Sequence, residues 1–469
     1  MSKIIKNVLS LGFANIFAQL FAFLFIMYYT KILNQDSVGL INLAQSILVY
    51  FTMMTLYGLQ TYGTREIAKH KDNIEDYVQH IIMIRLIIAC VSFLLLIVIS
   101  IGSNKGSSFT YIVILYGLTL FPTAFNLDWV YSGISEMQHN AVYNSIKSFT
   151  PFILLILFLR ENNNIFIIPI CTFLGVFLAS IYHLIIYKKK NFKFKISFDS
   201  EKIMYYLREA FPFFLSGMLS MINCNVDSII IGFLIGNQEL AIYSTGYKII
   251  FFLINLISII FIPIFPNLIS YYNNRDMHKL EILLSYLGKI IVMIATPILV
   301  GSIMLSKEIM VFLFKEEYVA SATSFNILSV YIFILFLRET YAYSLNAWGK
   351  EKFYLKVVSI SSIINLVLNF ILIPRFGINA AAVTTVISEL FNLFLMRKEA
   401  CKIVKISYIN SLYKIILPVA IMAVGIKILS PFHVLIKILL SIIIYFSSIL
   451  LFKYISIKEL KSIVNKKSN

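Results

Sequence analysis

Charge is scarce in this sequence of 469 residues. Only 13% of the residues are charged and 59% are hydrophobic, whereas about a quarter of the residues in soluble domains are charged. The mean hydropathy is +0.85. A soluble protein with so little polar surface would not stay dispersed, but a lipid bilayer solvates apolar side chains. The composition therefore predicts an integral membrane protein.

Sequence patterns that support catalysis are also missing. The four cysteines, at positions 90, 171, 224 and 401, show neither metal-binding nor redox spacing. The chain contains no phosphate-cradling Gly-Lys-Ser/Thr loop, no HExxH and no Asp-x-Asp. We therefore expect no metal, no cofactor, no ATP hydrolysis and no enzyme activity.

Long apolar stretches fill most of the sequence. A stretch of about 20 mostly apolar residues is long enough to cross a bilayer as a helix. The candidate spans lie near 8–31, 38–60, 79–101, 109–131, 143–159, 165–187, 207–234, 241–269, 281–305, 324–346, 355–373, 379–397, 409–429 and 432–453. The loops between them are too short for a soluble domain. This pattern predicts an all-α integral membrane protein with about 14 transmembrane helices.

The basic residues gather in every second loop. If the N-terminus is cytoplasmic, about two-thirds of the 40 lysines and arginines fall on the cytoplasmic side. The outside loops hold only Lys31, Lys105, Arg160, Lys307, Lys315 and Arg375. Such an asymmetry follows the positive-inside rule. It predicts cytoplasmic termini and accounts for the net charge of +17 without a nucleic-acid partner.

Two parts of the chain look like repeats. Asn34-Gln35 and Asn237-Gln238 each precede a long apolar stretch, a polar loop and a span that a basic residue enters. A constant offset of this kind is typical of a duplicated unit of six helices. We predict a six-helix lobe over 1–190, a basic cytoplasmic linker over 191–206, a second, pseudo-symmetric six-helix lobe over 207–400, and two extra helices with a basic tail over 401–469. The lysines at 188–195 either contact anionic lipid headgroups or are simply solvated.

Ionisable residues within the spans are the candidate functional residues. Each costs about 2.5–3.5 kcal/mol on insertion scales, so it usually faces a protein interior or an aqueous cavity. The deep set comprises Arg85, Lys248, Lys289, Arg338, Asp128, Asp227, Glu339 and Glu389. Lys414, Lys427 and Lys437 lie closer to span ends, where long side chains reach the headgroups.

Two pairs in this set are expected from depth. Asp227 and Lys248 lie at similar depth on consecutive spans, so they either neutralise each other or place Lys248 against a phosphate or an acidic sugar. Arg85 and Asp128 lie near the cytoplasmic ends of neighbouring spans. We predict either a scaffold pair or part of an inner gate.

Arg338 and Glu389 lie in separate spans. The Arg338 guanidinium suits bidentate binding of phosphate oxygens. Its neighbour Glu339 lies about 100° away around the helix, so we expect it to face another direction. Glu389 is either a coupling site for a proton or sodium ion, or a hydrogen-bonded core carboxyl. The uncharged candidates for a substrate cavity are Asn15, Gln19 and Asn223.

Several stretches, in order, resemble the O-antigen flippase (Wzx-type) family of polysaccharide transporters, part of the multidrug/oligosaccharidyl-lipid/polysaccharide exporter superfamily. The resemblance extends to about residue 400. It rests on Gly63-Thr64-Arg65-Glu66-Ile67-Ala68-Lys69, Asp128-Trp129-Val130-Tyr131-Ser132-Gly133 with Glu136, Asn225-Val226-Asp227, and Asn346-Ala347 with Gly349-Lys350-Glu351-Lys352.

This resemblance implies a flippase that moves undecaprenyl-diphosphate-linked oligosaccharide for O-antigen, capsule or a related polysaccharide across the bacterial cell membrane by alternating access. The implied partners are the lipid-linked oligosaccharide and membrane lipids, with polysaccharide polymerase and other biosynthesis proteins left open. A multidrug-type cation antiporter and a peptidoglycan lipid-precursor flippase of the same fold remain alternatives. An integral-membrane polymerase or glycosyltransferase fits less well, because the outside loops are short.

Overall fold

The computed structural model shows an all-helical chain in the residues it describes, which are 2–70, 73–160, 164–193, 198–261, 264–405, 408–452 and 454. Side chains up to residue 15 and at 220, 223, 255, 256, 258, 259, 409 and 410 are outside this description. The helices are α1 Ser2–Ile32, α2 Gln35–Leu56, α3 Leu59–Lys69, α4 Ile74–Gly102, α5 Ser107–Gly117, α6 Leu120–Ala124, α7 Asp128–Gly133, α8 Gln138–Phe158, α9 Ile167–Lys189, α10 Ser200–Leu234, α11 Asn237–Phe261, α12 Phe265–Asn273, α13 Met277–Leu313, η2 Glu316–Tyr318, α14 Ser321–Ala347, α15 Glu351–Phe376, α16 Ile378–Ala400, α17 Ile409–Ile428 and α18 Val434–Leu451.

The all-α membrane fold predicted from the sequence is confirmed, whereas the span number is not. Each apolar stretch predicted to cross the membrane contains helix. Within the described residues, eleven helices are long and apolar enough to span a membrane, or twelve if the bent α10 counts as one span. A count of about fourteen is therefore not confirmed.

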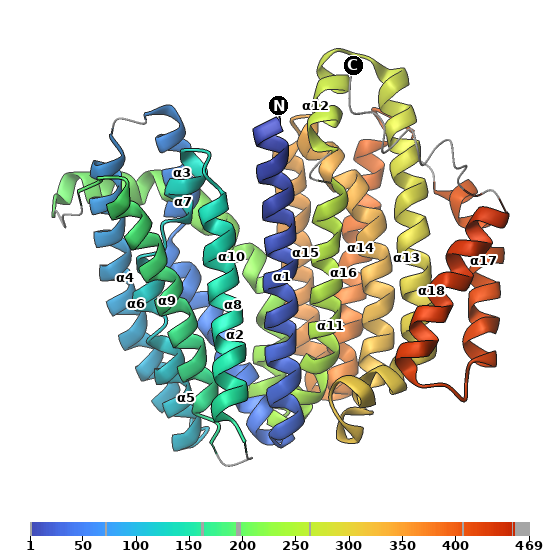
Figure 1. Cartoon of the computed structure of the whole chain (residues 1–469), viewed down its shortest axis with the longest axis horizontal. Coiled ribbons are helices and arrows are strands. Elements are labelled where there is room, and N and C mark those ends of the chain that lie inside the picture. Colours follow the sequence, from blue (N-terminus) through green and yellow to red (C-terminus); the bar gives the residue numbers. More distant parts are fainter. Residues whose placement is uncertain are drawn as a thin grey trace. The chain divides into compact units, whose positions relative to one another are not determined.

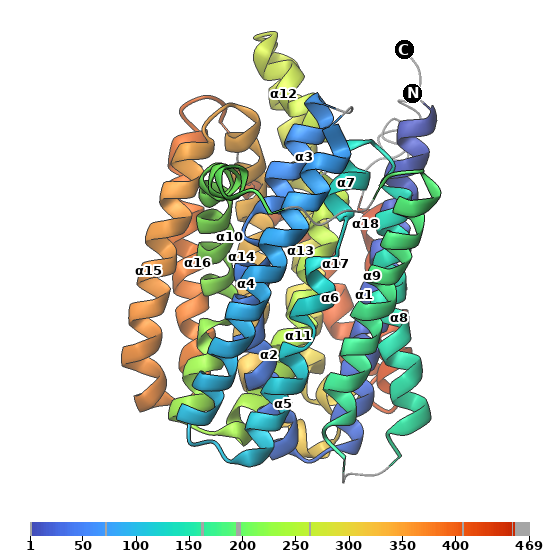
Figure 2. The same cartoon turned by 90° about the vertical axis from the view of Figure 1, so that its left-hand side faces the viewer.

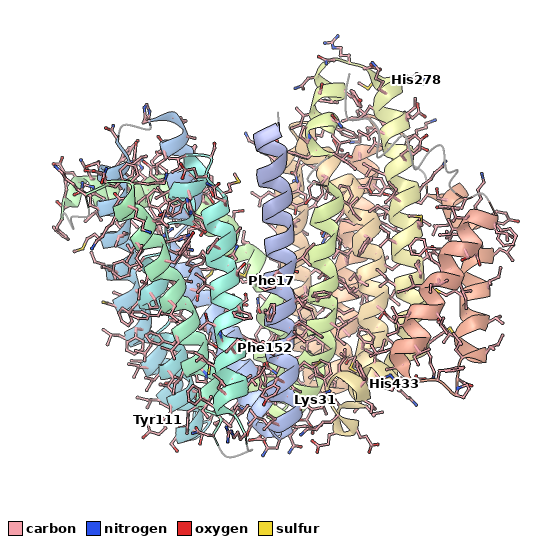
Figure 3. The ribbon with its side chains drawn as sticks, viewed as in Figure 1. Phe17, Lys31, Tyr111, Phe152, His278 and His433 are labelled. Carbon is pink, nitrogen blue, oxygen red and sulfur yellow. The ribbon has the colours of Figure 1, made fainter. Side chains whose placement is uncertain are left out.

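The chain divides into two compact units, residues 1–244 and 245–469. In the first unit, α4, α5 and α9 run side by side, and α8 packs between α9 and α1 (Figure 1). An aromatic seam joins α1 to α8: Phe21 meets Phe149 and Phe152 with ring centroids 5.0 and 5.5 Å apart. Phe17 and Phe152 point into this seam (Figure 3). The seam fixes α1 to its unit through ring packing, which needs no polar contact within the bilayer.

The second predicted span is broken into α2 and α3 at residues 57 and 58. Both residues have left-handed backbone conformations, with φ of 47° at Tyr57 and 68° at Gly58. Glycine adopts this conformation without steric cost. A Cβ at position 58 would also lie 2.5 Å from the backbone nitrogen of Phe214. The break therefore lets the backbone of α10 approach the junction between α2 and α3 closely.

The first part of α10 crosses the direction of its neighbours. It runs across the direction of α4 in Figure 1, packs on α3 and α4, and is seen nearly end-on in Figure 2. Side chains fasten it to the first unit: the Tyr57 ring stacks on Phe214 at 4.6 Å, and Lys202 pairs with Asp76 at 2.7 Å. Beyond Leu219 the helix bends by 58°. The span predicted over 207–234 does not anticipate this course. The sequence does hold a signal for it, because Glu201, Lys202, Arg208 and Glu209 make the first part of α10 richer in charge than a membrane span.

In the second unit, α14 packs against α13, α15 and α16, and α17 and α18 pack together on α13. His278, at the start of α13, and His433, just before α18, lie at opposite ends of this unit (Figure 3). Lys437, which was expected to reach the headgroups, has a carboxylate partner within this unit. Its side chain is 6% exposed, and its Nζ lies 2.8 Å from the carboxylate of Glu308 on α13. The Glu308 carboxylate on α13 therefore compensates the charge of the buried Lys437.

Large apolar side chains remain exposed on the outer faces of both units. On α4 they form a stripe of Leu94, Val98 and Ile101, each more than 60% exposed. Residues spaced by three or four share one face of a helix. Such a stripe is suited to contact with lipid chains. Polar residues of the spans, by contrast, are often buried within the units.

Candidate functional site

Buried charges meet between α14 and α16 in the second unit. Arg338 lies on α14 and donates from Nε to Glu389 Oε1 of α16 at 2.6 Å. The two side chains are only 10% and 7% exposed. Removing an isolated charge from water is costly, and a well-placed opposite charge offsets much of that cost. The structure thus brings together two residues that the sequence singled out separately.

Glu339 joins the same cluster, and the expectation that it faces elsewhere is wrong. Its Oε1 lies 3.0 Å from Arg338 Nη1. Helical spacing separates the two Cα–Cβ directions, but the long side chains of arginine and glutamate bend far enough to meet across that angle. One guanidinium therefore holds two carboxylates, and with both ionised the three groups carry a net charge of −1. We call Arg338, Glu339 and Glu389 the arginine cluster.

Polar side chains from two helices surround the arginine cluster. Asn392, one turn along α16, donates from Nδ2 to Glu389 Oε2 at 3.2 Å. Tyr354 on α15 lies near enough to interact electrostatically with Arg338. These neighbours leave few unsatisfied atoms on the charged groups, which is the condition for a stable buried network.

A polar ladder continues from the cluster between α15 and α16. Ser361 donates to the carbonyl of Ser388 at 2.9 Å. Further along, Asn369 donates to Asn365 at 3.0 Å and accepts from Thr384. Sequence reasoning missed these residues, although Ser361, Asn365 and Asn369 are four residues apart and so share one helix face. Such hydrogen bonds hold helices together within a bilayer.

A second group of charges is buried in the first unit. Arg85 is 0% exposed, and its Nη1 donates to the carbonyl of Asn126 at 2.9 Å. The Asp128 carboxylate interacts electrostatically with both Arg85 and Lys147. Arg85 and Asp128 thus lie in one group of charges, but the structure shows no direct ion pair between them, so a scaffold pair or inner gate stays a prediction. The sequence reasoning did not assign Lys147 to a site, although it lies inside the apolar stretch 143–159.

Histidine supports the loop that carries Asp128. His183 on α9 is fully buried. Its Nδ1 lies 3.2 Å from the Leu127 backbone nitrogen and 3.1 Å from Asn126 Oδ1. The carbonyl of His183 accepts from the Tyr131 hydroxyl at 2.7 Å. These contacts fix the segment between α6 and α7, so the position of Asp128 depends on α9 as well as on its own helix.

Asp227 is buried near the end of α10 and accepts hydrogen bonds within the first unit. Its partners are the Tyr243 hydroxyl and the backbone nitrogen of Ser228, at 2.8 Å. Lys248 belongs to the second unit, and its pairing with Asp227 stays a prediction.

The structure describes the side chain of one of the three uncharged candidates. Gln19 is half-buried on α1. The side chains of Asn15 and Asn223 lie outside the described residues. Across the ranges that the structure describes, no group of three or more histidine, cysteine or carboxylate residues is arranged to hold a metal. The groups that the structure brings together are thus buried ion pairs and ladders of hydrogen-bonded polar side chains.

Comparison with known proteins identifies the family of this chain. Residues 4–272 match the family described as polysaccharide biosynthesis protein, which is more than half of the chain. The chain belongs to this family. It is also 24% identical over 279 residues to a Shigella dysenteriae protein described as "Putative O-antigen transporter", covering 59% of this chain and 70% of that protein. The resemblance seen in the sequence is therefore confirmed.

Solved structures define the fold of this member of the polysaccharide biosynthesis family. The lipid II flippase MurJ, in an inward closed conformation, has a TM-score of 0.76 at 18% identity, covering 95% of this chain and 98% of that one. An inward-facing multidrug resistance MATE transporter of the MOP superfamily has a TM-score of 0.65 at 13% identity, covering 82% and 95%. The chain is thus a multi-pass membrane protein with the MOP-superfamily fold.

Proposed function

We propose that this chain is a flippase. It moves undecaprenyl-diphosphate-linked oligosaccharide, destined for O-antigen, capsule or a related polysaccharide, across the bacterial cytoplasmic membrane by alternating access. Both termini face the cytoplasm in this proposal, as the distribution of basic residues predicts. Family membership and the exporter fold support the proposal.

The observation that carries it is the arginine cluster. A guanidinium buried at membrane depth is held by two oxyanions, Glu339 and Glu389. A diphosphate offers the same kind of partner, with oxygens placed for bidentate hydrogen bonds. When the site is empty, the carboxylates compensate Arg338. When substrate enters, its phosphate oxygens replace one of them.

This exchange links transport to ion uptake. A carboxylate displaced from Arg338 is left buried, and it becomes neutral by taking up a proton. Glu389 is the coupling residue in this scheme, because it makes the shorter contact with the guanidinium. Lys248, Asp227 and the half-buried Gln19 are further candidates for contacts with substrate. The Arg85 and Asp128 group is the candidate inner gate.

The primary test is complementation of a strain that lacks the gene. Arg338→Lys keeps the positive charge that compensates Glu339 and Glu389 but loses the bidentate geometry of the guanidinium. It should strongly reduce surface glycan and accumulate lipid-linked units on the cytoplasmic face at normal membrane levels. Arg375→Lys is the matched control, because Arg375 is exposed near the end of α15. Undiminished glycan export by Arg338→Lys would remove the proposed role of the cluster.

Coupling is tested separately in proteoliposomes with imposed gradients. We expect transport of lipid-linked oligosaccharide by the wild type to follow the proton gradient, and Glu389→Gln to transport at a rate independent of that gradient. Dependence on sodium alone would assign another coupling ion. A rate indifferent to both gradients would remove coupling altogether.

The similarity to the lipid II flippase supports a second candidate function, translocation of a peptidoglycan lipid precursor. Both candidates move a lipid-linked glycan, so the sugar part of the substrate distinguishes them. Rescue of a strain depleted of its lipid II flippase would favour the second candidate. Loss of surface glycan with normal growth on gene deletion would favour the first.

A further inference from the structure

Two stretches that the sequence resemblance emphasised interlock in the first unit. One is α3, which carries Gly63 and Thr64, and the other is α7, which begins with Asp128 and Trp129. A Cβ at Gly63 would overlap the Trp129 ring. Thr64 Oγ1 also lies 3.3 Å from the carbonyl of Trp129. The two short helices are thereby held at close approach.

A cavity of about 420 Å³ opens where these helices meet. It is lined by Gln60, Thr61, Thr64, Arg65, Asp128, Trp129 and Ser132. Small-molecule sites commonly have volumes of about 300–1,000 Å³. Every residue of the lining carries a side chain that can form hydrogen bonds. The cavity therefore has the size and polarity of a binding site.

Two lining residues carry buried polar atoms that lack a protein partner. These atoms are Asp128 Oδ1, an acceptor, and Trp129 Nε1, a donor. A buried polar atom left without a partner costs about 1–3 kcal/mol. Beneath them lies Arg85, whose guanidinium carbon is 5.9 Å from the centre of the Trp129 ring. Both atoms are shielded from solvent, so the groups that the cavity presents directly to a ligand are the other polar atoms of its lining residues.

The charges of the lining distinguish between classes of ligand. The Asp128 carboxylate disfavours a phosphate. Arg65 is paired with Glu66 at 2.8 Å and with Glu209 at 3.4 Å. The Asp128 carboxylate already interacts with Arg85 and Lys147, so it is not left as an uncompensated charge that would attract a cation. A neutral polyhydroxyl compound is penalised by neither charge and uses both. Its hydroxyls donate to carboxylate and carbonyl oxygens and accept from amide and guanidinium groups.

We propose that this cavity binds a neutral sugar ring of the lipid-linked oligosaccharide. The proposal rests on the proposed function for its substrate and adds the place where the glycan is recognised. The Asp128 carboxylate accepts a hydrogen bond from a sugar hydroxyl, and Thr64, Gln60 and Ser132 line the rim. Recognition of sugar by the first unit is then separable from recognition of diphosphate by Arg338.

Binding of two lipids to the purified full-length protein in nanodiscs tests the proposal. One lipid is undecaprenyl diphosphate without sugar. The other is lipid-linked oligosaccharide extracted from cells that lack the gene. Asp128→Asn should weaken binding of the sugar-bearing lipid about tenfold, the effect of losing one charge-assisted hydrogen bond, and leave the bare lipid unaffected. Asp199→Asn is the matched control, because asparagine also caps a helix well and Asp199 caps α10.

Asp128→Asn could disturb folding, because Asp128 lies beside the buried Arg85. A second variant therefore tests the same cavity without changing a charge. Thr64→Val keeps the side-chain shape and touches no buried charge. It should weaken only the sugar-bearing lipid, about threefold or more, whereas Thr110→Val should change neither lipid. Equal loss for both lipids, or wild-type protein that binds both equally, overturns the sugar site. Wild-type protein that binds neither lipid overturns the proposed function instead.

Discussion

Replacing Arg338 by methionine should destabilise the second unit strongly. The variant leaves Glu389 and Glu339 buried together, with side chains 7% and 18% exposed, after loss of the cation that holds both. Removing one partner of a buried ion pair costs about 3–5 kcal/mol. Two stranded carboxylates place Arg338→Met at the upper end of this range.

Glu389→Gln should have a much smaller effect. Arg338 keeps Glu339 at 3.0 Å, and the net charge of the arginine cluster changes from −1 to zero. The glutamine carbonyl still accepts from Arg338 Nε. We expect a loss below about 1 kcal/mol, close to the effect of an ordinary hydrogen bond. The double variant Arg338→Met/Glu389→Gln should be more stable than Arg338→Met, because it leaves one stranded carboxylate fewer.

The assay is unfolding of the purified full-length chain in detergent micelles at neutral pH, followed by circular dichroism. Arg375→Met is the control for loss of an arginine at an exposed position. A double-mutant cycle over the two sites measures their coupling. If Glu389→Gln costs as much as Arg338→Met, or if the two effects simply add, the account of one cation shared by two carboxylates is refuted.

Three further stability predictions use the same unfolding assay. Gly63→Ala should cost about 1–3 kcal/mol, because the new methyl group overlaps an indole ring and overpacking strains a core; Gly102→Ala, with open space around it, should not show this loss. Gly58→Ala should cost more than Gly349→Ala, since both have positive φ but only Gly58 faces a backbone within 2.5 Å; equal losses would mean that conformational strain alone matters. Lys437→Met should cost less than about 1 kcal/mol, because its glutamate partner is 43% exposed and stays hydrated; a larger loss would show that this pair holds α18 in place.

The helices were predictable because bilayer thickness imposes a length of apolar sequence that few other structures need. The same argument indicated which charges matter, and Arg338 and Glu389 do meet. It gave no information on how a long apolar segment runs. The span predicted over 207–234 takes in part of the crossing segment of α10, whose charged residues, Glu201, Lys202, Arg208 and Glu209, distinguish it from a span. The close backbone contact at Gly58 has no sequence signal of its own.

Side-chain reach limited the prediction of the site. Helical angle separates Glu339 from Arg338, yet both side chains are long enough to meet. Lys437 looked like a residue of a span end, and its partner on α13 was far away in sequence. The cavity beside Asp128 was equally hidden, since its two halves come from distant motifs whose contact depends on a glycine packing against Trp129.

The packing of Gly63 against Trp129 makes this tryptophan an optical reporter. A second tryptophan can report on the other unit. The chain contains two tryptophans. Trp129 lies in the first unit beside the sugar-site cavity, and Trp348 lies in the second unit, stacked on Tyr272 at 5.6 Å. Both are almost fully buried, so each emits from a defined environment. A Trp348→Phe variant would leave a single tryptophan, whose emission on selective excitation reports on the cavity, and Trp129→Phe would leave only the tryptophan of the other unit.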